Sequence, residues 1–298
     1  MMVAAMVQRK YKFVAVALAL CTGIFATGCV GLHNALSVPV ERTTIVELDS
    51  WPKNAKPIRI ALLSDIHVGN LVMRPERLRS IVDAVNAARP DIVLLAGDFV
   101  IGERREGTAT RARDLAPLAG LHPPGGVFAV LGNHDHWTDA GAIQARLTHA
   151  GVRVLENDAV RRGAITIVGI GDRFSGHDDI ARSWQRAASL GGIAVAFTHS
   201  PDVVPDLPKT MPVLFAGHTH CGQVVAPWIG PIGRYSRWHR LYDPKYRCGR
   251  VDEPGRVTIV TGGVGSGTLP MRFNAMPDWW LIELRARAPR ASNTPTDT

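Results

Sequence analysis

The sequence predicts an α/β fold in which short buried strands alternate with amphipathic helices. Two apolar runs of strand length, residues 58–63 and 91–96, flank a segment with helical periodicity, residues 75–88. Strand, helix and strand in this order are typical of an α/β unit. A third observation extends the pattern along the chain. Five apolar runs stop at a short cluster of polar residues, as strands do where they reach the functional edge of a sheet.

The composition is that of a packed globular protein. Of the 298 residues, 46% are hydrophobic and 20% are charged, which suits one large domain or two small ones. The net charge of +8 and the pI near 9.7 indicate an anionic partner: nucleic acid, phospholipid or a small phosphorylated substrate. The chain has no long Lys/Arg run and no nucleic-acid motif, so nucleic acid is not expected. Its four cysteines form no CxxC pair, which excludes a zinc ribbon.

The first 32 residues are interpreted as a signal peptide or an N-terminal membrane anchor. Residues 1–12 carry Arg9, Lys10 and Lys12 and no acid, and the next twenty, Phe13 to Leu32, are uncharged and mostly apolar. This length can span a bilayer, and the basic flank keeps the N-terminus in the cytoplasm. Alternatively, Ala26-Thr27-Gly28 before Cys29 resembles the end of a bacterial lipoprotein signal, whose cysteine receives the lipid. Both interpretations predict a membrane-associated protein with the rest of the chain on the periplasmic side.

The remainder of the chain divides into three parts. Residues 33–57 are predicted to form an extended linker, because the segment is polar and contains three prolines. The globular domain is predicted to span 58–285. Residues 286–298 form a polar tail that we expect to be disordered.

Within the domain, local patterns predict each helix and strand. The helix at 75–88 begins at Pro75, which suits a first turn, and is stopped by Pro90. Further helices are expected at 114–119, 140–150 and 180–190, and the charged residues 103–113 are expected to form an exposed loop. Strands are expected at 58–63, 91–96, 126–131, 152–155, 165–170, 193–197, 213–216, 257–260 and 280–284.

The polar clusters at the strand ends carry the candidate chemistry. Taken alone, each cluster is weak evidence for a functional site, because an Asp after a strand usually caps a turn and a lone His is more often a hydrogen-bonded loop residue. Together they supply Asp, Asn and His, which bind divalent metals of borderline hardness. They are too many for one tetrahedral site but enough for two metals that share a bridging carboxylate, and the i, i+2 pairs point to one side of an extended segment. The clusters are Asp65 and His67; Asp98; Asn133, His134 and Asp135; His199; and His218 and His220.

In this order the clusters resemble the motifs of the calcineurin-like metallophosphoesterase superfamily: Asp-x-His, Gly-Asp, Gly-Asn-His-Asp, His and Gly-His-x-His. The resemblance runs from Ile58 to about Leu284. Two further phrases, GHTHCGQ at 217–223 and GTLPMRF at 267–273, are similar to the branch of membrane-associated bacterial phosphodiesterases. That branch often has Gly at the position of Cys221.

The resemblance implies a fold and a set of ligands. The fold is a four-layer α/β/β/α sandwich of two mixed β-sheets flanked by helices. The cofactors are two divalent metal ions, Mn, Zn or Fe, with Asp98 as the bridging ligand. The implied ligands of the first metal are Asp65, His67, Asp98 and His220, and Asn133, His199 and His218 complete the second.

The implied chemistry is hydrolysis of a phosphoester. Two metal ions roughly 3.5–4 Å apart lower the pKa of a bridging water, giving a hydroxide that attacks phosphorus in line. They also neutralise charge on the phosphoryl oxygens. By resemblance, His134 stabilises the transition state or protonates the leaving oxygen, and Asp135 fixes the orientation of His134.

A basic and aromatic segment follows the last implied ligand, His220. Its side chains suit a phospholipid or another anionic polymer, with Arg234, Arg237 and Arg240 as candidate substrate-binding residues. The alternative is a long loop whose aromatic residues pack on the sandwich. The aromatic residues are Trp228, Tyr235, Trp238, Tyr242 and Tyr246.

Two cysteines, Cys221 and Cys248, bracket this segment. In an oxidising compartment they could form a disulfide; the alternatives are two independent thiols, or Cys221 as an extra soft ligand. His136 and the cluster His177-Asp178-Asp179 could also face the site, but we expect them behind the ligands or on the surface.

We therefore expect a metal-dependent phosphoesterase that hydrolyses a phosphodiester or pyrophosphate bond in an anionic envelope or lipid-linked substrate. A phosphomonoesterase or phosphoprotein phosphatase would have the same ligands, because substrate choice lies in the surrounding loops. A non-catalytic metal-binding scaffold on the same fold would show eroded ligands, and none is eroded here.

Overall fold

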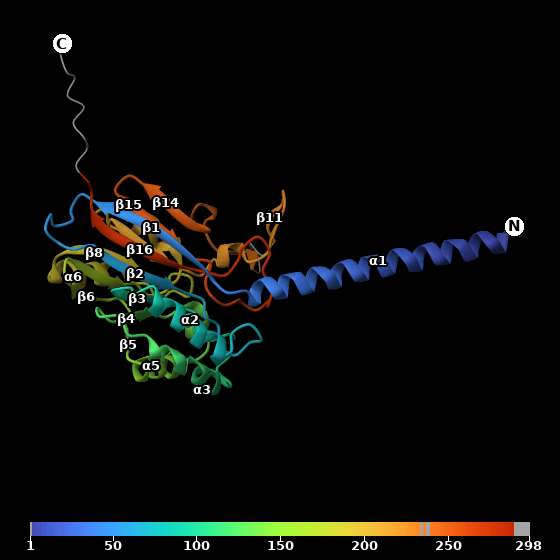
Figure 1. The fold of residues 1–298 in the computed structure, drawn as a ribbon, viewed down its shortest axis with the longest axis horizontal. Coiled ribbons are helices and arrows are strands. Elements are labelled where there is room, and N and C mark those ends of the chain that lie inside the picture. Colours follow the sequence, from blue (N-terminus) through green and yellow to red (C-terminus); the bar gives the residue numbers. More distant parts are fainter. Residues whose placement is uncertain (1, 233–234, 237–238, 289–298) are drawn as a thin grey trace, which may run out of the picture.

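Two six-stranded sheets lie face to face in the computed structural model, and helices cover the outer face of each sheet (Figure 1). The structure describes residues 2–232, 235–236 and 239–288. The predicted four-layer α/β/β/α class is confirmed by this arrangement. Of the tail predicted at 286–298, residues 289–298 lie outside the described part of the chain.

The first sheet has the order β1-β16-β2-β3-β4-β5. Strands β2 to β5 run parallel to one another, β16 is antiparallel to β2, and β1 is parallel to β16. The bounds are β1 Val40–Leu48, β16 Asp278–Ala286, β2 Ile58–Leu63, β3 Ile92–Ala96, β4 Val127–Val130 and β5 Val152–Val154.

The second sheet has the order β14-β15-β9-β8-β7-β6. Its four inner strands are parallel, and the two edge strands are antiparallel to their neighbours. Both sheets are therefore mixed. The bounds are β14 Gly249–Glu253, β15 Arg256–Val260, β9 Val213–Ala216, β8 Ile193–Phe197, β7 Ile165–Gly169 and β6 Asp158–Arg162.

The helices form the two outer layers. Those on the first sheet are α2 Pro75–Ala87, α3 Thr108–Arg111, the 3-10 helix η1 Ala112–Gly120 and α5 Ala140–His149. Those on the second sheet are α6 Ile180–Leu190 and η2 Pro201–Asp206. Short elements border the site: α4 Asn133–Trp137, η3 His220–Gly222, β10 Val225–Ala226, β11 Gly230–Pro231, β12 Tyr235–Ser236, β13 His239–Arg240 and η4 Pro244–Tyr246.

Alternation along the strands builds the layers. In β2, Ile60 and Leu62 pack between the two sheets, whereas Ala61 and Leu63 face the helices. A period of two is what a strand needs when both of its faces are buried in different layers. The same division holds throughout, so three apolar cores fill the three interfaces of the four layers.

Within the two six-stranded sheets, three strands lie where the sequence predicts none: β1, β6 and β14. Strand β1 lies within the segment 33–57 that was expected to be a linker, and it pairs with β16 over its whole length. All three are edge strands with partly exposed, polar sequences, so they lack the apolar run by which strands were recognised. Part of the expected linker therefore belongs to the sandwich.

The N-terminal helix α1, Met2–Leu36, projects away from the sandwich (Figure 1). Within it, Tyr11–Leu36 is long and apolar enough to cross a membrane by length and composition. Its last turns, from Gly31, are in contact with the domain, where Gly31 and Ala35 are buried.

Candidate metal centre

The five polar clusters meet at one edge of the sandwich. Asp65 and His67 follow β2, Asp98 follows β3, and α4 carries Asn133 directly after β4. The second sheet contributes the residues that follow β8 and β9, His199 and then His218 and His220. Parallel strands place their carboxyl ends at a common edge, which is why residues far apart in sequence converge here.

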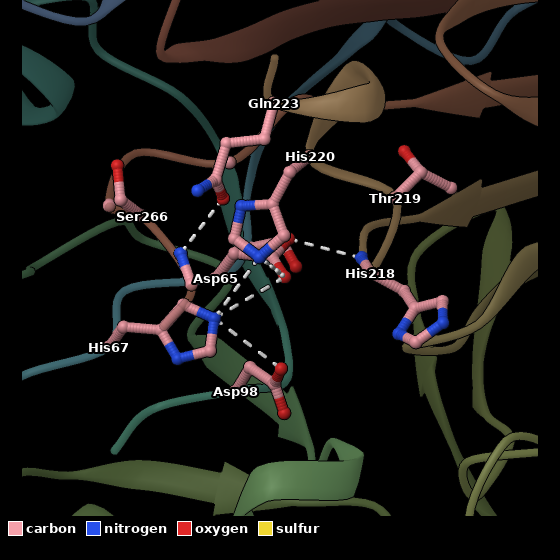
Figure 2. A network of polar contacts seen from close by, with 12 residues as sticks. Asp65, His67, Asp98, His218, Thr219, His220, Gln223 and Ser266 are labelled. Atoms are coloured by element: carbon pink, nitrogen blue, oxygen red, sulfur yellow. Dashed lines mark hydrogen bonds and ion pairs between the residues drawn. The ribbon is translucent and has the colours of Figure 1, made fainter. Parts of the chain in front are cut away.

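The first group of donors surrounds the space between His67 and His220 (Figure 2). The Nε2 atoms of these two rings lie 3.2 Å apart. Oδ1 of Asp65 is 3.3 Å from Nε2 of His220 and 3.9 Å from Nε2 of His67. Three donor atoms, two from the segment after β2 and one from the turn after β9, thus face one another in a volume that suits a single cation.

The second group consists of Asn133, His199 and His218. Oδ1 of Asn133 lies 3.1 Å from Nε2 of His199 and 3.0 Å from Nδ1 of His218, and the two ring nitrogens are 3.2 Å apart. The far nitrogen of each ring faces a backbone carbonyl: Nδ1 of His199 is 2.8 Å from the oxygen of Ala96, and Nε2 of His218 is 2.9 Å from that of Leu241. In the neutral rings these far nitrogens carry the hydrogens, so lone pairs converge at the centre.

Asp98 lies between the two groups. Its Oδ2 is 3.5 Å from Nε2 of His67 in the first group and 3.3 Å from Nε2 of His199 in the second. Its Oδ1 accepts a hydrogen bond from the backbone N–H of His134 at 2.9 Å. Among the candidate ligands, this carboxylate is therefore the one placed to be shared.

The donor set fits divalent cations. Oδ1 of Asp65 is buried and receives no hydrogen bond, and the converging lone pairs of the second group repel one another unless a positive charge lies among them. Imidazole nitrogens combined with carboxylate and amide oxygens suit Zn, Fe and Mn. Ca and Mg, in contrast, prefer oxygen ligands. Two cations that share Asp98 would satisfy both groups.

Burial and mutual charge set the protonation of these residues. Burial lowers the pKa of His67 to about 3 and that of His218 to about 4, so both rings are neutral and keep a lone pair at neutral pH. Burial also raises the pKa of Asp65 to about 6. Burial acts against the charged forms of Asp98 and His199, but their mutual attraction outweighs it, lowering the pKa of Asp98 and raising that of His199. A proton in the metal-free centre thus occupies the position that a cation would take.

The backbone at the centre is strained. Eleven non-glycine residues in the described part of the chain have positive φ, and five of them are candidate ligands: Asp65, His67, Asp98, His218 and His220. Such conformations cost energy and persist where the surrounding structure imposes them, often at functional sites. Here they turn each side chain back toward the common centre directly after its strand.

Close backbone approach at the centre requires glycine at two positions. A Cβ on Gly132 would lie 2.3 Å from Oδ1 of Asp98, and one on Gly217 would lie 1.8 Å from Oγ of Ser64. Both glycines precede candidate ligands, Asn133 and His218. Any side chain there would displace the ligands.

His134 and Asp135 differ in their positions. The ring of His134 lies 5.0 Å from that of His67, and one of its nitrogens is among the donors clustered with His67 and Asp98. Its Nδ1 lies 2.6 Å from the carbonyl oxygen of Gly102, which leaves Nε2 to face the centre. Gly102 therefore fixes this ring.

The expectation that Asp135 orients the His134 ring is wrong. The buried carboxylate of Asp135 instead accepts four backbone hydrogen bonds, from the N–H groups of Asp98, Phe99, Val100 and Gly132. Burial and the charge of Asp98 raise the pKa of Asp135 to about 7, while the backbone N–H groups act in the opposite direction. Asp135 thus supports the centre from behind by holding the turns that carry Asp98 and Asn133.

Two features of the site were missed by sequence reasoning. Arg272 is fully buried, donates to the carbonyl oxygens of Gly262, Gly265 and Ala275, and places Nη2 3.2 Å from Nδ1 of His220. It lies in the 267–273 phrase, but nothing in that phrase alone shows the contact. The ring of Phe174 lies tilted against that of His218, with centroids 4.6 Å apart, in a loop held by Asp172. The Gly171-Asp172 pair after β7 is a sixth strand end that could have indicated it.

The expectations for the segment after His220 are met only in part. Cys221 and Cys248 form a disulfide, with Cα atoms 4.8 Å apart, so of the three alternatives left open by the sequence the structure has the disulfide. Tyr242 and Tyr246 are buried, whereas Trp228 is fully exposed. Arg234, Arg237 and Trp238 lie outside the described residues, as do the side chains of Tyr235 and Arg240.

The other polar residues near the site stay outside the ligand set. His136 stacks on His177 with ring centroids 3.6 Å apart, and its Nε2 is 3.6 Å from Glu156. Asp178 pairs with Arg173, and Asp179 caps α6. These contacts agree with the expectation that they lie behind the ligands or on the surface.

Comparison with known proteins gives matches over this same region. A family model described as Calcineurin-like phosphoesterase matches residues 58–222. The chain is 31% identical over 257 residues to the Bacillus subtilis (strain 168) protein named uncharacterized metallophosphoesterase YkoQ, covering 83% of this chain and 90% of that one. It is 30% identical over 244 residues to phosphodiesterase YaeI of Escherichia coli (strain K12), covering 78% and 83%. A Danio rerio transmembrane protein with metallophosphoesterase domain is 29% identical over 276 residues, covering 86% of this chain but 59% of that one.

Proposed function

This chain belongs to the calcineurin-like phosphoesterase family, and on that premise we propose that it is a dinuclear metal-dependent phosphoesterase acting on phosphodiester or pyrophosphate bonds. One observation supports this function above the others: two groups of nitrogen and oxygen donors share the carboxylate of Asp98. The first group would hold one metal through Asp65, His67, Asp98 and His220. The second would hold another through Asn133, His199 and His218 with Asp98.

Each protein group has a separate task in this reaction. When bound, two divalent metal ions supply an activated water and neutralise charge on the phosphoryl oxygens. His134 lies beside the first group with Nδ1 held by Gly102, so a proton on its Nε2 can pass to the leaving oxygen. Asp135 keeps the backbone under Asp98 and Asn133 in place and takes no part in proton transfer.

The site is proposed to act outside the cytoplasm, in a protein held to the membrane by its N-terminus. Support comes from the basic residues before the apolar part of α1, from its Tyr11–Leu36 span, and from the transmembrane name of the Danio rerio relative. The disulfide between Cys221 and Cys248 suits an oxidising compartment. Whether α1 stays uncleaved or Cys29 becomes a lipidated N-terminus is tested by lipid labelling of Cys29→Ala.

The name of one relative favours a phosphodiester over a phosphomonoester as the substrate. YaeI, at 30% identity, is named a phosphodiesterase. The basic residues Arg234, Arg237 and Arg240 of the segment after His220 are proposed to bind an anionic envelope or lipid-linked substrate. A phosphomonoesterase or phosphoprotein phosphatase remains the second candidate, because it would use the same donors.

The test is hydrolysis by the full chain after metal removal and reloading with Mn²⁺, Zn²⁺ or Fe²⁺. A monoester and a diester with the same chromogenic leaving group are compared at equal concentration with a pyrophosphate diester, whose two monoester products are quantified by chromatography. We expect no turnover without metal and a diester or pyrophosphate rate above the monoester rate. A metal-loaded chain with no hydrolysis of any of the three would contradict the proposed function, and a faster monoester would favour the second candidate.

A further inference from the structure

The apolar helix α1 packs its C-terminal end directly on the globular domain. The carbonyl oxygen of Gly31 accepts a hydrogen bond from the backbone N–H of Arg272 at 2.9 Å, and the amide of Asn34 donates to the carbonyl oxygen of Arg272 at 3.0 Å. A Cβ on Gly31 would lie 2.6 Å from the ring of Phe273, so helix and loop touch without space between them. On the other side, Arg77 of α2 donates to the carbonyl oxygens of Ala35 and Ser37.

This junction fixes where the metal centre lies relative to the helix. The loop that holds Gly31 also carries the Arg272 guanidinium, which reaches 3.2 Å from Nδ1 of His220. One residue of the loop therefore contacts both the end of α1 and a candidate metal ligand. With no free linker at this point, the centre stays close to the surface at which α1 leaves the membrane.

Exposed apolar side chains surround the same junction. Leu36 and Leu71 line a hollow of about 630 Å³ between the end of α1 and α2. Asn70 donates to the carbonyl oxygen of Ser266 at 3.1 Å, which ties the Leu71 loop to the loop that packs on Gly31. The hairpin β10–β11 rises beside the base of α1 (Figure 1). We call the following residues the apolar collar: Leu36, Val38, Leu71, Trp228, Ile229, Ile232 and Leu269.

A second hollow leads from the apolar collar to the metal centre. It has a volume of about 420 Å³, and Val224, Ile232, Leu241 and Leu269 form its apolar wall. The candidate ligands His218 and His220 also line it. These two are also the only candidate ligands within the described residues that are not fully buried. An apolar group that entered between Ile232 and Leu269 would thus bring an attached phosphate toward them.

We propose that the apolar collar rests in the bilayer that α1 crosses, and that the hollow behind Ile232 and Leu269 receives the apolar chain of a phosphoester drawn from that bilayer. This inference rests on the proposed phosphoesterase function and names its substrate class. A lipid surface is the occupant because α1 places one directly beside the collar, so no other partner has to be recruited. A fully exposed Trp228 next to two exposed isoleucines is the kind of tip that inserts at a membrane interface.

The first experiment measures collar contact and needs neither metal nor turnover. The full chain is placed in phosphatidylcholine–phosphatidylglycerol nanodiscs with ordinary or brominated acyl chains, which quench nearby tryptophan. The chain has seven tryptophans, so the Trp228 signal is taken as the difference from Trp228→Phe. We expect brominated lipid to remove most of it. Leu190→Trp, at the end of α6, is the control whose added signal should be unquenched; an equally unquenched Trp228 would overturn the docking.

The second experiment tests the hollow with methyl and hexadecyl esters of p-nitrophenyl phosphate, which share one leaving group. The metal-loaded full chain should favour the hexadecyl ester in kcat/KM. Ile232→Ser with Leu269→Ser should reduce that preference about tenfold, because two apolar contacts with the chain are lost. Leu190→Ser is the matched control and should keep the preference. Equal kcat/KM for both esters in the unaltered chain would overturn the chain-binding hollow, whereas no hydrolysis of either ester would count against the phosphoesterase function and leave the Trp228 result to decide the docking.

Discussion

The candidate ligands divide into two walls that are held in different ways. The strand-end wall, Asp65, His67, Asp98, Asn133 and His199, is fully buried and follows directly from strands. The loop wall consists of His218 and His220, which are partly exposed and come from the turn after β9. Backbone groups next to the strands fix the first wall: Asp135 binds the turn at 98–100, and Ala96 faces His199.

Residues much later in the chain support the loop wall. His218 faces the carbonyl oxygen of Leu241, His220 contacts Arg272, and the hydroxyl of Thr219 donates to the carbonyl oxygen of Arg247 at 2.6 Å. The disulfide Cys221–Cys248 adds a covalent tie. The difference teaches that the sandwich sets the positions of most candidate ligands, whereas the 219–273 region sets the exposed side of the site. The strand-end wall should therefore tolerate change less than the loop wall.

The largest effect is expected from Asp98→Ala. This variant removes the carboxylate that both donor groups share, so both metals should be lost and turnover should fall by more than the roughly 10²–10³-fold that follows removal of one preorganised donor. Metal analysis of the purified chain and hydrolysis of a chromogenic diester give the two readings. Asp83→Ala, at an exposed position on α2, is the control. Two metals per chain in Asp98→Ala would break the assignment of a shared ligand.

His134→Asn should separate chemistry from metal binding. If His134 donates a proton to the leaving oxygen, turnover should fall about 10²–10⁴-fold, while metal content stays normal. Substrates whose leaving group is a weak base need less protonation and should lose less. Because one nitrogen of His134 lies among donors of His67 and Asp98, loss of metal in this variant would instead identify it as a ligand.

Asp135→Asn tests the support behind the strand-end wall. The amide has one acceptor oxygen where the carboxylate has two, and its NH₂ group would face backbone N–H groups. At about pH 8, above the raised pKa of Asp135, at least two buried N–H groups lose a charged acceptor, so we expect a loss of about 4 kcal/mol in the free energy of unfolding. Chemical denaturation of the metal-free chain measures it. Asp139→Asn, at the partly exposed N-cap of α5, should cost much less.

The sequence predicted the strand-end wall well because its information is local. Each ligand follows an apolar run, and a run of strand length with a polar end can be read without knowing its neighbours. The parallel order of the strands then brings the ends together. The strand ends thus suffice to predict that Asp65, Asp98, Asn133 and His199 lie together.

The features that local sequence patterns do not predict are of two kinds. They are side-chain contacts with residues distant in the sequence, and strands whose sequence is mostly polar. Arg272 lies 52 residues from His220, and no local pattern indicates that its guanidinium reaches that ring. Asp135 sits next to His134, yet its carboxylate accepts hydrogen bonds from the backbone of Asp98 and Phe99 in the turn after β3. Strand β1 is missing from the prediction because its alternation is weak and its pairing with β16 spans the whole domain.

The smallest effect is expected from opening the disulfide, as in Cys221→Ser with Cys248→Ser. The two cysteines are 27 residues apart, and closing such a loop limits the unfolded chain by about 3.5 kcal/mol in the chain-entropy account. Thermal unfolding should show this loss. Cys21→Ser, in the exposed part of α1, is the matched control and should leave the melting temperature unchanged.

For the metal centre, the same double variant should have a milder outcome than Asp98→Ala. His220 adjoins Cys221, so its position relaxes, but Asp65, His67 and Asp98 keep their strand-end supports. We therefore expect metal affinity to fall by about 10–100-fold, as when an outer partner of a ligand is removed, and bound metal to return when metal is supplied in excess. Titration of the metal-free chain measures this, and failure to bind even one metal would show that the loop wall is as indispensable as the strand-end wall.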